Sequence, residues 1–123
     1  HIQAAIRAIY SSPPAHGGNV VATILSNASL RDLWIKELGE MRTRISTMRQ
    51  AFVQQMAVRQ QVVDFDFINH QKGMFSFSGL TQEQVLKLRE DNHIYIVGSG
   101  RINVAGITPS NIEPLCDAVA RVL

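Results

Sequence analysis

The sequence holds a single cysteine, Cys116, so no disulfide can form within the chain. One thiol fits a reducing compartment such as the cytoplasm. No stretch approaches the roughly 18 uncharged apolar residues that cross a bilayer. The first residues also lack the basic and apolar segments of a signal peptide. We therefore expect a cytoplasmic protein that makes no contact with a membrane.

Neither positive nor negative charge predominates in the sequence. The sequence has 12 Lys and Arg against 10 Asp and Glu, a net charge of +2, and the basic residues are scattered. A nucleic-acid-binding surface needs a concentrated basic stripe, so we expect no nucleic-acid partner. The 123 residues are 46% hydrophobic and 18% charged, which excludes a disordered tail and indicates one domain at most, or a piece of a larger protein.

Helical periodicity is strongest between residues 28 and 60. Apolar residues recur there at steps of three or four, at Leu30, Leu33, Trp34, Leu38, Met41, Ile45, Met48, Phe52 and Met56. Ser29 and Asp32 resemble a capping box at the start. A helix of about 30 residues is roughly 45 Å long, whereas a globule of this chain length is about 35 Å across. We therefore expect the helix to bridge two domains or to belong to an intertwined assembly.

The other side chains of this helix are predicted by type. Glu40 and Arg44 have the spacing of a favourable ion pair one helical turn apart. The methionines expected in the core are Met41, Met48 and Met56. The arginines expected on a solvated helix face are Arg42, Arg44 and Arg49.

The segments on either side of the long helix have different patterns. Before it, the prolines Pro13 and Pro14 predict a shaped loop over residues 11–18, followed by a short helix over 20–25. After it, the predicted strands are residues 63–67, 74–77, 94–97 and 101–105. Thr81 opens a helix over 82–91 with a capping box. Thr108 is expected to cap the last helix and Pro109 to occupy its first position; its buried face is expected to contain Ile112, Leu115, Cys116 and Val119.

Several motifs do not support a known kind of site. Gly98-Ser99-Gly100 lacks the third glycine of a dinucleotide loop and leads into a strand rather than a helix. Cys116 lies on an apolar helix face, which favours a buried structural thiol. The four histidines are too widely spaced for a local metal motif, and we expect no metal site; they are His1, His16, His70 and His93.

Two arginines stand apart from the rest. Arg101 follows a glycine-rich turn at the start of a strand, where glycine lets the backbone approach a ligand closely. A guanidinium there can bind a carboxylate through two parallel hydrogen bonds. Arg7 lies just ahead of the rigid Pro-Pro loop, which could hold it in place. From the residues alone, the simpler interpretation of each remains a surface arginine near a turn.

Three runs of the sequence resemble class I aspartate and aromatic amino acid aminotransferases, and the resemblance covers essentially the whole chain. Residues 7–17 (RAIYSSPPAHG) look like the family's Tyr-Ser-Asn-Pro-Pro-x-His-Gly segment. Residues 69–80 contain its Gly-Met-Phe-Ser-Phe-Ser-Gly run, and residues 99–106 its Ser-Gly-Arg-x-Asn-Val-Ala-Gly signature. The bacterial members are the most similar.

The resemblance implies roles for four residues. Arg101 falls on the arginine that binds the substrate α-carboxylate, and Phe75 on an aromatic that closes over the substrate. Arg7 falls on the arginine that reaches into the neighbouring subunit's active site and binds the side-chain carboxylate of aspartate or glutamate. Ser12 stands where aspartate-specific members commonly have asparagine, as in members that also accept aromatic amino acids. The implied partners are amino-acid and 2-oxo-acid substrates, and the implied assembly is a homodimer.

The resemblance also implies a cofactor that the chain does not hold by itself. In the family, a lysine binds pyridoxal phosphate as a Schiff base, and that lysine lies upstream of this segment. The lysines present, Lys36, Lys72 and Lys87, match none of the family's cofactor residues, so no catalytic and no cofactor-binding residue is expected here.

The implied fold class is α/β with an α+β small domain, the C-terminal part of a fold type I pyridoxal-phosphate-dependent transferase. Residues 1–27 would end the large cofactor-binding domain, residues 28–60 would form the inter-domain helix, and residues 61–123 would form most of the small domain. The long helix would pack on a small sheet with flanking helices. Two other interpretations stay open: a non-catalytic α+β module that binds an amino acid, and a structural dimerisation piece built on the long helix.

Overall fold

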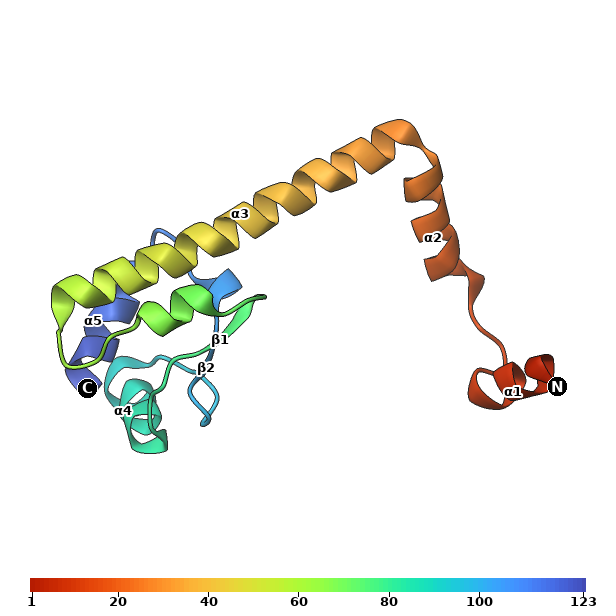
Figure 1. Ribbon diagram of the computed structural model, residues 1–123. Coiled ribbons are helices and arrows are strands. Elements are labelled where there is room, and N and C mark those ends of the chain that lie inside the picture. The colour runs from red at the N-terminus through yellow and green to blue at the C-terminus, as the bar shows by residue number, and fades with distance from the viewer. The chain divides into compact units, whose positions relative to one another are not determined.

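Helices dominate the chain, and a small sheet joins two of its segments (Figure 1). The computed structural model describes all residues from His1 to Leu123. The elements in chain order are α1 (Ile2–Ile9), α2 (Ala15–Ser26), α3 (Ala28–Arg59), η1 (Asp66–His70), β1 (Phe75–Phe77), α4 (Gln82–Asn92), β2 (Arg101–Asn103), η2 (Val104–Gly106) and α5 (Ile112–Val122). None of the helices is both long enough and apolar enough to span a membrane.

The long helix α3 is confirmed over almost the predicted range, but its cap is not the predicted one. The side chain of Asn27 accepts hydrogen bonds from the Leu30 amide at 3.2 Å and from the Ser29 hydroxyl at 2.8 Å. Ser29 therefore lies inside the helix, and the predicted capping box of Ser29 and Asp32 is wrong. Asn27 is a good N-cap because its short side chain reaches the free amides of the first turn. Helix α2 also begins earlier than predicted, so the loop after Tyr10 ends at Pro14.

The predicted start is correct for helix α4 and wrong for helix α5. Thr81 caps α4 through the full capping box with Gln84, as predicted. Helix α5 begins at Ile112, one turn after the predicted start. Thr108 and Pro109 instead belong to a turn in which the Thr108 amide donates to the Asn111 side chain at 2.8 Å. Because this turn already pairs the Thr108 amide, Thr108 does not cap the helix, and α5 begins only after the turn.

The sheet consists of two short antiparallel strands, with Phe75 opposite Asn103 and Phe77 opposite Arg101. The predicted strands over 63–67 and 94–97 are wrong, because neither segment pairs with another strand. In the first, Phe65 is buried and meets the ring of Phe52 edge to face, with ring centroids 5.8 Å apart. The chain then enters η1. The predicted strand over 101–105 ends at Asn103, and η2 follows it.

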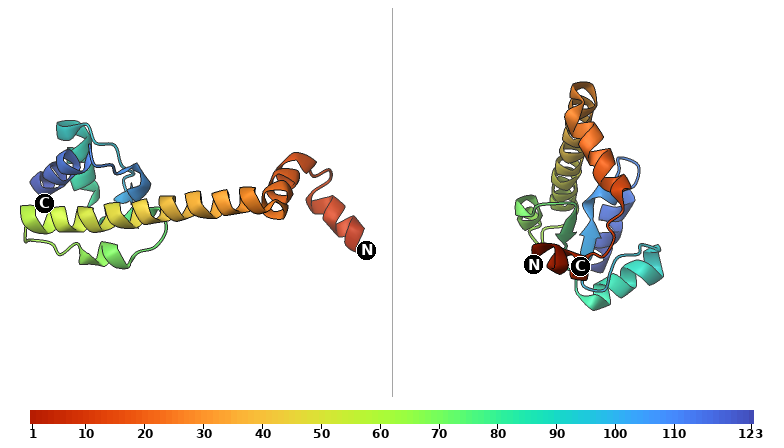
Figure 2. Two further views of the ribbon diagram at one scale, coloured as in Figure 1. Left: turned by 90° about the horizontal axis from the view of Figure 1, so that it is seen from above. Right: turned by 90° about the vertical axis from the view of Figure 1, so that its right-hand side faces the viewer.

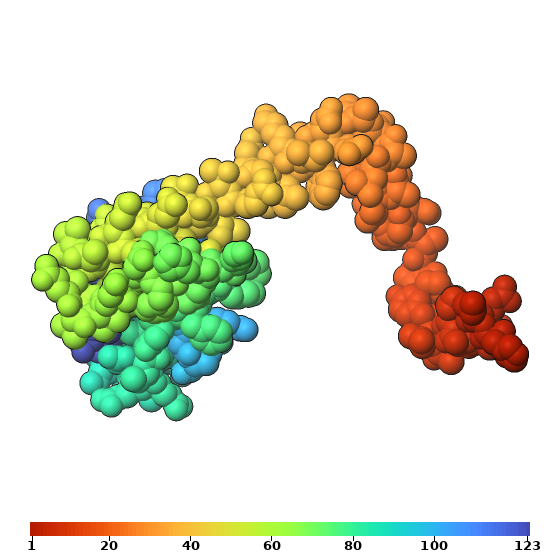
Figure 3. Space-filling view, viewed as in Figure 1, coloured from red at the N-terminus to blue at the C-terminus, as the bar shows by residue number.

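The chain divides into two compact units, His1–Glu40 and Met41–Leu123. In the first unit, α1 and α2 contain no buried residue. In the second unit, the C-terminal part of α3 lies between η1 and α5, as the left view of Figure 2 shows. The elements of this unit pack against one another, as the space-filling view shows (Figure 3). The core therefore belongs to the second unit.

The core of the second unit is apolar and well filled. Its fully buried side chains include Phe52, Met56, Ile68, Val85, Leu88, Val104 and Cys116. Helix α5 buries the predicted face, with Leu115 half-buried. Met48 packs against the core, whereas Met41 is 55% exposed and does not join it.

Two of the three arginines predicted on a solvated face of α3 are engaged with the protein. Arg49 is buried, with only 8% of its surface exposed. Arg44 donates to the carbonyl oxygens of Ile107 and Ala105, at 3.1 and 2.7 Å, and not to Glu40. Glu40 instead faces Lys36 across a weak exposed pair, with 3.9 Å between the charged atoms. The predicted ion pair of Glu40 and Arg44 is therefore wrong.

Candidate functional site

Arg101 and Phe75 lie together on the exposed face of the two-stranded sheet. Both strands alternate exposed, buried, exposed, which places Ser76 and Ile102 inside and the other residues outside. The guanidinium carbon of Arg101 lies 4.8 Å from the centre of the Phe75 ring. A cation at that distance over an aromatic face is attracted to the ring. The sheet thus orients an exposed cation and gives it an apolar support.

The guanidinium of Arg101 is free to bind an anion. It forms no ion pair and donates no hydrogen bond to another residue; the acidic side chains paired in the structure are Glu40, Asp66, Glu83 and Asp117. Phe75 is 43% exposed, so the ring covers one side of the cation and leaves its edges open. A planar guanidinium with free edges can hold a carboxylate by two parallel hydrogen bonds.

Packing against neighbouring residues of the chain, and not a ligand, requires glycine in the turn before Arg101. Gly100 has a φ of +74°, and a Cβ there would lie 2.8 Å from the Leu80 carbonyl oxygen. The Gly100 carbonyl accepts hydrogen bonds from the amide and the hydroxyl of Ser78, at 3.0 and 2.7 Å. The close approach that the sequence attributed to a ligand is therefore made to residues 78–80, and it fixes where β2 begins.

Arg7 and Ser12 belong to the first unit. Arg7 lies in the last turn of α1 and Ser12 in the loop that follows, and both are exposed. Neither side chain makes a hydrogen bond or an ion pair within the chain. The structure therefore brings Arg101 and Phe75 together within the second unit, whereas Arg7 and Ser12 belong to the first.

Sequence reasoning missed the residues that support the sheet, Arg49 and Gln71. Arg49 donates to two backbone carbonyls of the turn before β1, and the Gln71 side chain bonds to Phe77. A signal for Arg49 was present in the sequence. It lies four residues after Ile45 and three before Phe52, so helical spacing places it on the apolar side of α3. A charged residue at such a position must find buried partners.

The residues of this chain do not fit pyridoxal phosphate as a covalent site. Lys36 and Lys87 are exposed and face Glu40 and Glu83 one turn away on their own helices. Lys72 is exposed in the turn before β1. None of the three lysines lies beside Arg101 in the sheet, and none projects into a buried cleft where a phosphate and a ring could be held.

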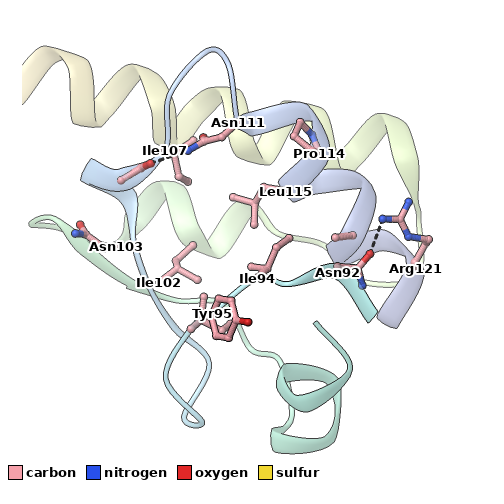
Figure 4. Close-up of a pocket in the computed structure, with 13 residues that line it drawn as sticks. Asn92, Ile94, Tyr95, Ile102, Asn103, Ile107, Asn111, Pro114, Leu115 and Arg121 are labelled. Carbon is pink, nitrogen blue, oxygen red and sulfur yellow. Dashed lines mark hydrogen bonds between the residues drawn. The ribbon is translucent and has the colours of Figure 1, made fainter. Parts of the chain in front are cut away.

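A pocket of about 490 Å³ lies between residues 94–96, β2 and α5 (Figure 4). Its lining is mainly apolar, with Ile94, Ile102 and Leu115 facing inward (Figure 4). Its arginine and two of its asparagines are already paired: Arg121 donates to Asn92 at 2.6 Å, and Asn111 donates to the Gly106 carbonyl at 2.9 Å. This pocket therefore presents no set of groups suited to acid–base or nucleophilic chemistry.

Cys116 is the buried thiol that the sequence predicted. It is fully buried, and burial in apolar surroundings raises the pKa of its thiol to about 11. A thiol with so high a pKa stays protonated near neutral pH and is a poor nucleophile. No three or more His, Cys, Asp or Glu side chains gather where they could hold a metal ion.

Comparison with known proteins gives one consistent result. The family model for class I and II aminotransferases matches residues 1–119. An aspartate aminotransferase of Escherichia coli strain K12 is 60% identical over 99% of this chain, and an aromatic-amino-acid aminotransferase of the same strain is 41% identical over 99% of it. The chain spans 31% of the length of each of these curated relatives.

A solved structure agrees with this result. The aromatic-amino-acid aminotransferase of Burkholderia pseudomallei, covalently bound to pyridoxal phosphate, has a TM-score of 0.91 and 49% sequence identity. That alignment covers 96% of this chain and 30% of the other. The fold class predicted from the sequence is confirmed by this match.

Proposed function

The chain belongs to the class I and II aminotransferases, and from that premise we propose that the whole protein moves the amino group of an amino acid to a 2-oxo acid. Aspartate and glutamate are the proposed amino donors, and aromatic amino acids are further ones. The observation that carries this proposal is the exposed, unpaired guanidinium of Arg101 held over the Phe75 ring. Relatives named for both aspartate and aromatic substrates support the range.

Arg101 acts in this proposal by binding the carboxylate common to all amino acids. Two parallel hydrogen bonds fix both the position and the rotation of that carboxylate. The α-carbon is then held in one orientation, which lowers the entropy that the reaction would otherwise lose. Phe75 excludes water from one side of the ion pair, which strengthens the pair.

Arg7 and Ser12 are proposed to set the substrate range. Arg7 would bind the second carboxylate of aspartate or glutamate in the site of a neighbouring subunit, so the protein would act as a homodimer. Its exposed position at the end of α1 is compatible with such a contact. Ser12 replaces the larger asparagine of aspartate-specific members and leaves more room for an aromatic side chain.

Pyridoxal phosphate is the proposed cofactor, and a lysine outside residues 1–123 would hold it covalently, because none of the three lysines of this chain fits that role. When bound, the cofactor supplies the electron sink for amino-group transfer. Residues 1–27, 28–60 and 61–123 are proposed as the end of the cofactor domain, the inter-domain helix and the small domain. A cytoplasmic location is proposed from the single buried cysteine.

Steady-state kinetics of the complete protein tests this proposal. We expect Arg101→Ala to lower kcat/KM for aspartate and phenylalanine alike by about 100-fold, because each charge-assisted hydrogen bond contributes about 1.5–3 kcal/mol. Arg7→Ala should lower kcat/KM for aspartate by about tenfold or more and spare phenylalanine. Arg42→Ala is the matched control, since Arg42 is exposed and makes no hydrogen bond.

Two results would reject parts of the proposal. Binding of amino acids without transamination by the complete wild-type protein would favour the non-catalytic module. Equal losses on aspartate and phenylalanine in Arg7→Ala would reject the division of roles between the two arginines.

A further inference from the structure

We propose that Arg49 is a positioning residue that sets the carboxylate affinity of Arg101 from inside the second unit. The inference rests on the proposed function, because it assigns Arg101 to carboxylate binding. It concerns a different residue, however, one that lies in α3 and touches no substrate. The route runs from Arg49 to the turn before β1, and from that turn to the face that carries Arg101.

The first step is the contact between Arg49 and the turn. Its Nη1 donates to the Gln71 carbonyl at 2.5 Å, and its Nη2 donates to the Gly73 carbonyl at 2.6 Å. Arg49 is only 8% exposed and forms no ion pair, so its two strong partners are these carbonyl oxygens. A rigid guanidinium that bonds two carbonyls fixes their separation and their direction together. The turn over residues 71–73 is therefore held to α3 at two points.

The second step leads from the turn to β1. The side-chain oxygen of Gln71 accepts from the Phe77 amide at 2.8 Å, and its side-chain nitrogen donates to the Phe77 carbonyl at 3.1 Å. In an antiparallel strand the amide and carbonyl of one residue point to the same side. The Gln71 amide therefore pairs with the edge of β1 that faces away from β2, as a third strand would. Arg49 holds the backbone of the same Gln71.

The third step leads from β1 to Arg101. Phe77 lies directly opposite Arg101 in the register of the sheet. Phe75 follows Gly73 by two residues, and its ring supports the guanidinium at 4.8 Å. Both partners of Arg101 in the sheet are thus fixed by a turn that Arg49 holds. If the turn moves, the ring and the strand that orient Arg101 move with it.

The effect should appear in ligand affinity and not only in stability. Phe75, Phe77 and Arg101 are exposed, so a shift of β1 changes their positions without opening the core. A bidentate contact is sensitive to small displacements of the guanidinium. A purely structural role for Arg49 would lower the midpoint of unfolding and leave the affinity of the folded protein unchanged.

The test uses the complete, cofactor-loaded protein and two unreactive carboxylates. The first, 3-phenylpropionate, has one carboxylate and reports on Arg101; the second, succinate, has two and reports on both arginines. Dissociation constants are measured by calorimetric titration, and folding is measured separately by thermal unfolding. The variants are Arg49→Met, which removes both hydrogen bonds, and Arg49→Lys, which keeps the charge but lacks the planar guanidinium with its two donor nitrogens. Gln71→Leu breaks only the link to Phe77, and Arg42→Ala on the same helix is the control.

We expect Arg49→Met and Gln71→Leu to raise both dissociation constants by about tenfold. Arg49→Lys should give a smaller increase, because one ammonium can hold one carbonyl well but not both. Arg42→Ala should match the wild type. Gln71 is only half-buried, so Gln71→Leu decides the question if Arg49→Met does not fold.

Two outcomes overturn the inference, and they differ from each other. Wild-type dissociation constants in a folded Arg49→Lys or Gln71→Leu protein, even with a lowered midpoint, would make Arg49 merely structural while the proposed function stands. Failure of the wild-type protein to bind either carboxylate would reject the proposed function, and the inference with it.

Discussion

The two units of the chain differ in how their side chains are satisfied. In residues 41–123, apolar residues from α3, η1, α4, β2 and α5 enclose one another, and Phe52 is only 2% exposed. In residues 1–40, the apolar side chains stay largely open, with Ile2 78% and Ile9 85% exposed. The second unit thus holds its structure through its own core. The helices α1 and α2 of the first unit contain no buried residue.

The two proposed substrate contacts are therefore held in different ways. Arg101 is oriented by residues of its own unit: the Phe75 ring, the opposite strand, and the turn that Arg49 holds. Arg7 ends a helix with no buried residue. The proposed carboxylate affinity of Arg101 would therefore be set within the second unit, whereas no buried residue of α1 fixes the position of Arg7.

Truncating one apolar side chain in each half of α3 should separate the two units most clearly. Phe52→Ala should destabilise the chain by about 3–5 kcal/mol, because it leaves a cavity in the core. Leu33→Ala should change the free energy of unfolding by less than about 0.5 kcal/mol, since Leu33 is 51% exposed. Denaturant unfolding of residues 1–123 measures both. Similar losses would mean that the first half of α3 is packed as well.

Glycine substitutions should have opposite signs in the two units. Gly100→Ala forces a side chain onto a φ of +74° and against the Leu80 carbonyl, so we expect a loss of about 2 kcal/mol. Gly18→Ala places alanine in the open helix α2, where no atom lies within 4 Å of the new Cβ. Helix content by circular dichroism should rise slightly there, because alanine favours the helix by about 1 kcal/mol. A gain in stability from Gly100→Ala would contradict this account of the turn.

The buried thiol should give the second unit a dependence on pH that the first lacks. The pKa of Cys116 is raised from 9.0 to about 11, so the unfolded chain loses this proton at lower pH than the folded one. Stability from this group is therefore complete below about pH 9 and falls as the pH rises toward 11, by about 2 kcal/mol. Free energies of unfolding at several pH values should show a steeper decline for wild type than for Cys116→Ala. Parallel curves would disprove the contribution.

The smallest expected contrast is between two helix caps. Thr81→Ala removes the capping box of α4, which packs on the core, and should cost about 1 kcal/mol of global stability. Asn27→Ala removes the cap of α3 in the first unit. Its loss should fray that helix end without changing global unfolding, because little of the core depends on it. Amide hydrogen exchange at Leu30 would detect the fraying, and an equal global loss in both variants would argue against it.

Local signals in the sequence were enough where the chemistry is local. The capping box of Thr81, the helical spacing over residues 28–60 and the apolar face of α5 all reappear in the structure. These depend on residues a few positions apart, whose contacts are fixed once the backbone turns into a helix. The predicted strands over 63–67 and 94–97 failed because a strand needs a partner far away in sequence, and alternation alone does not supply one.

The candidate site divides in the same way. The sequence, through the family it resembles, predicted a substrate-binding role for Arg101, Phe75, Arg7 and Ser12, and it predicted that the lysine for the cofactor lies outside this segment. The positions of Phe75 over Arg101, of Gly100 against residues 78–80 and of the buried Arg49 against two carbonyls became clear only from the packed structure. Each of these contacts joins residues 20 or more positions apart in the sequence. Which of them form depends on how the core closes, because burial leaves a charged or polar group only the partners that the packed chain brings to it.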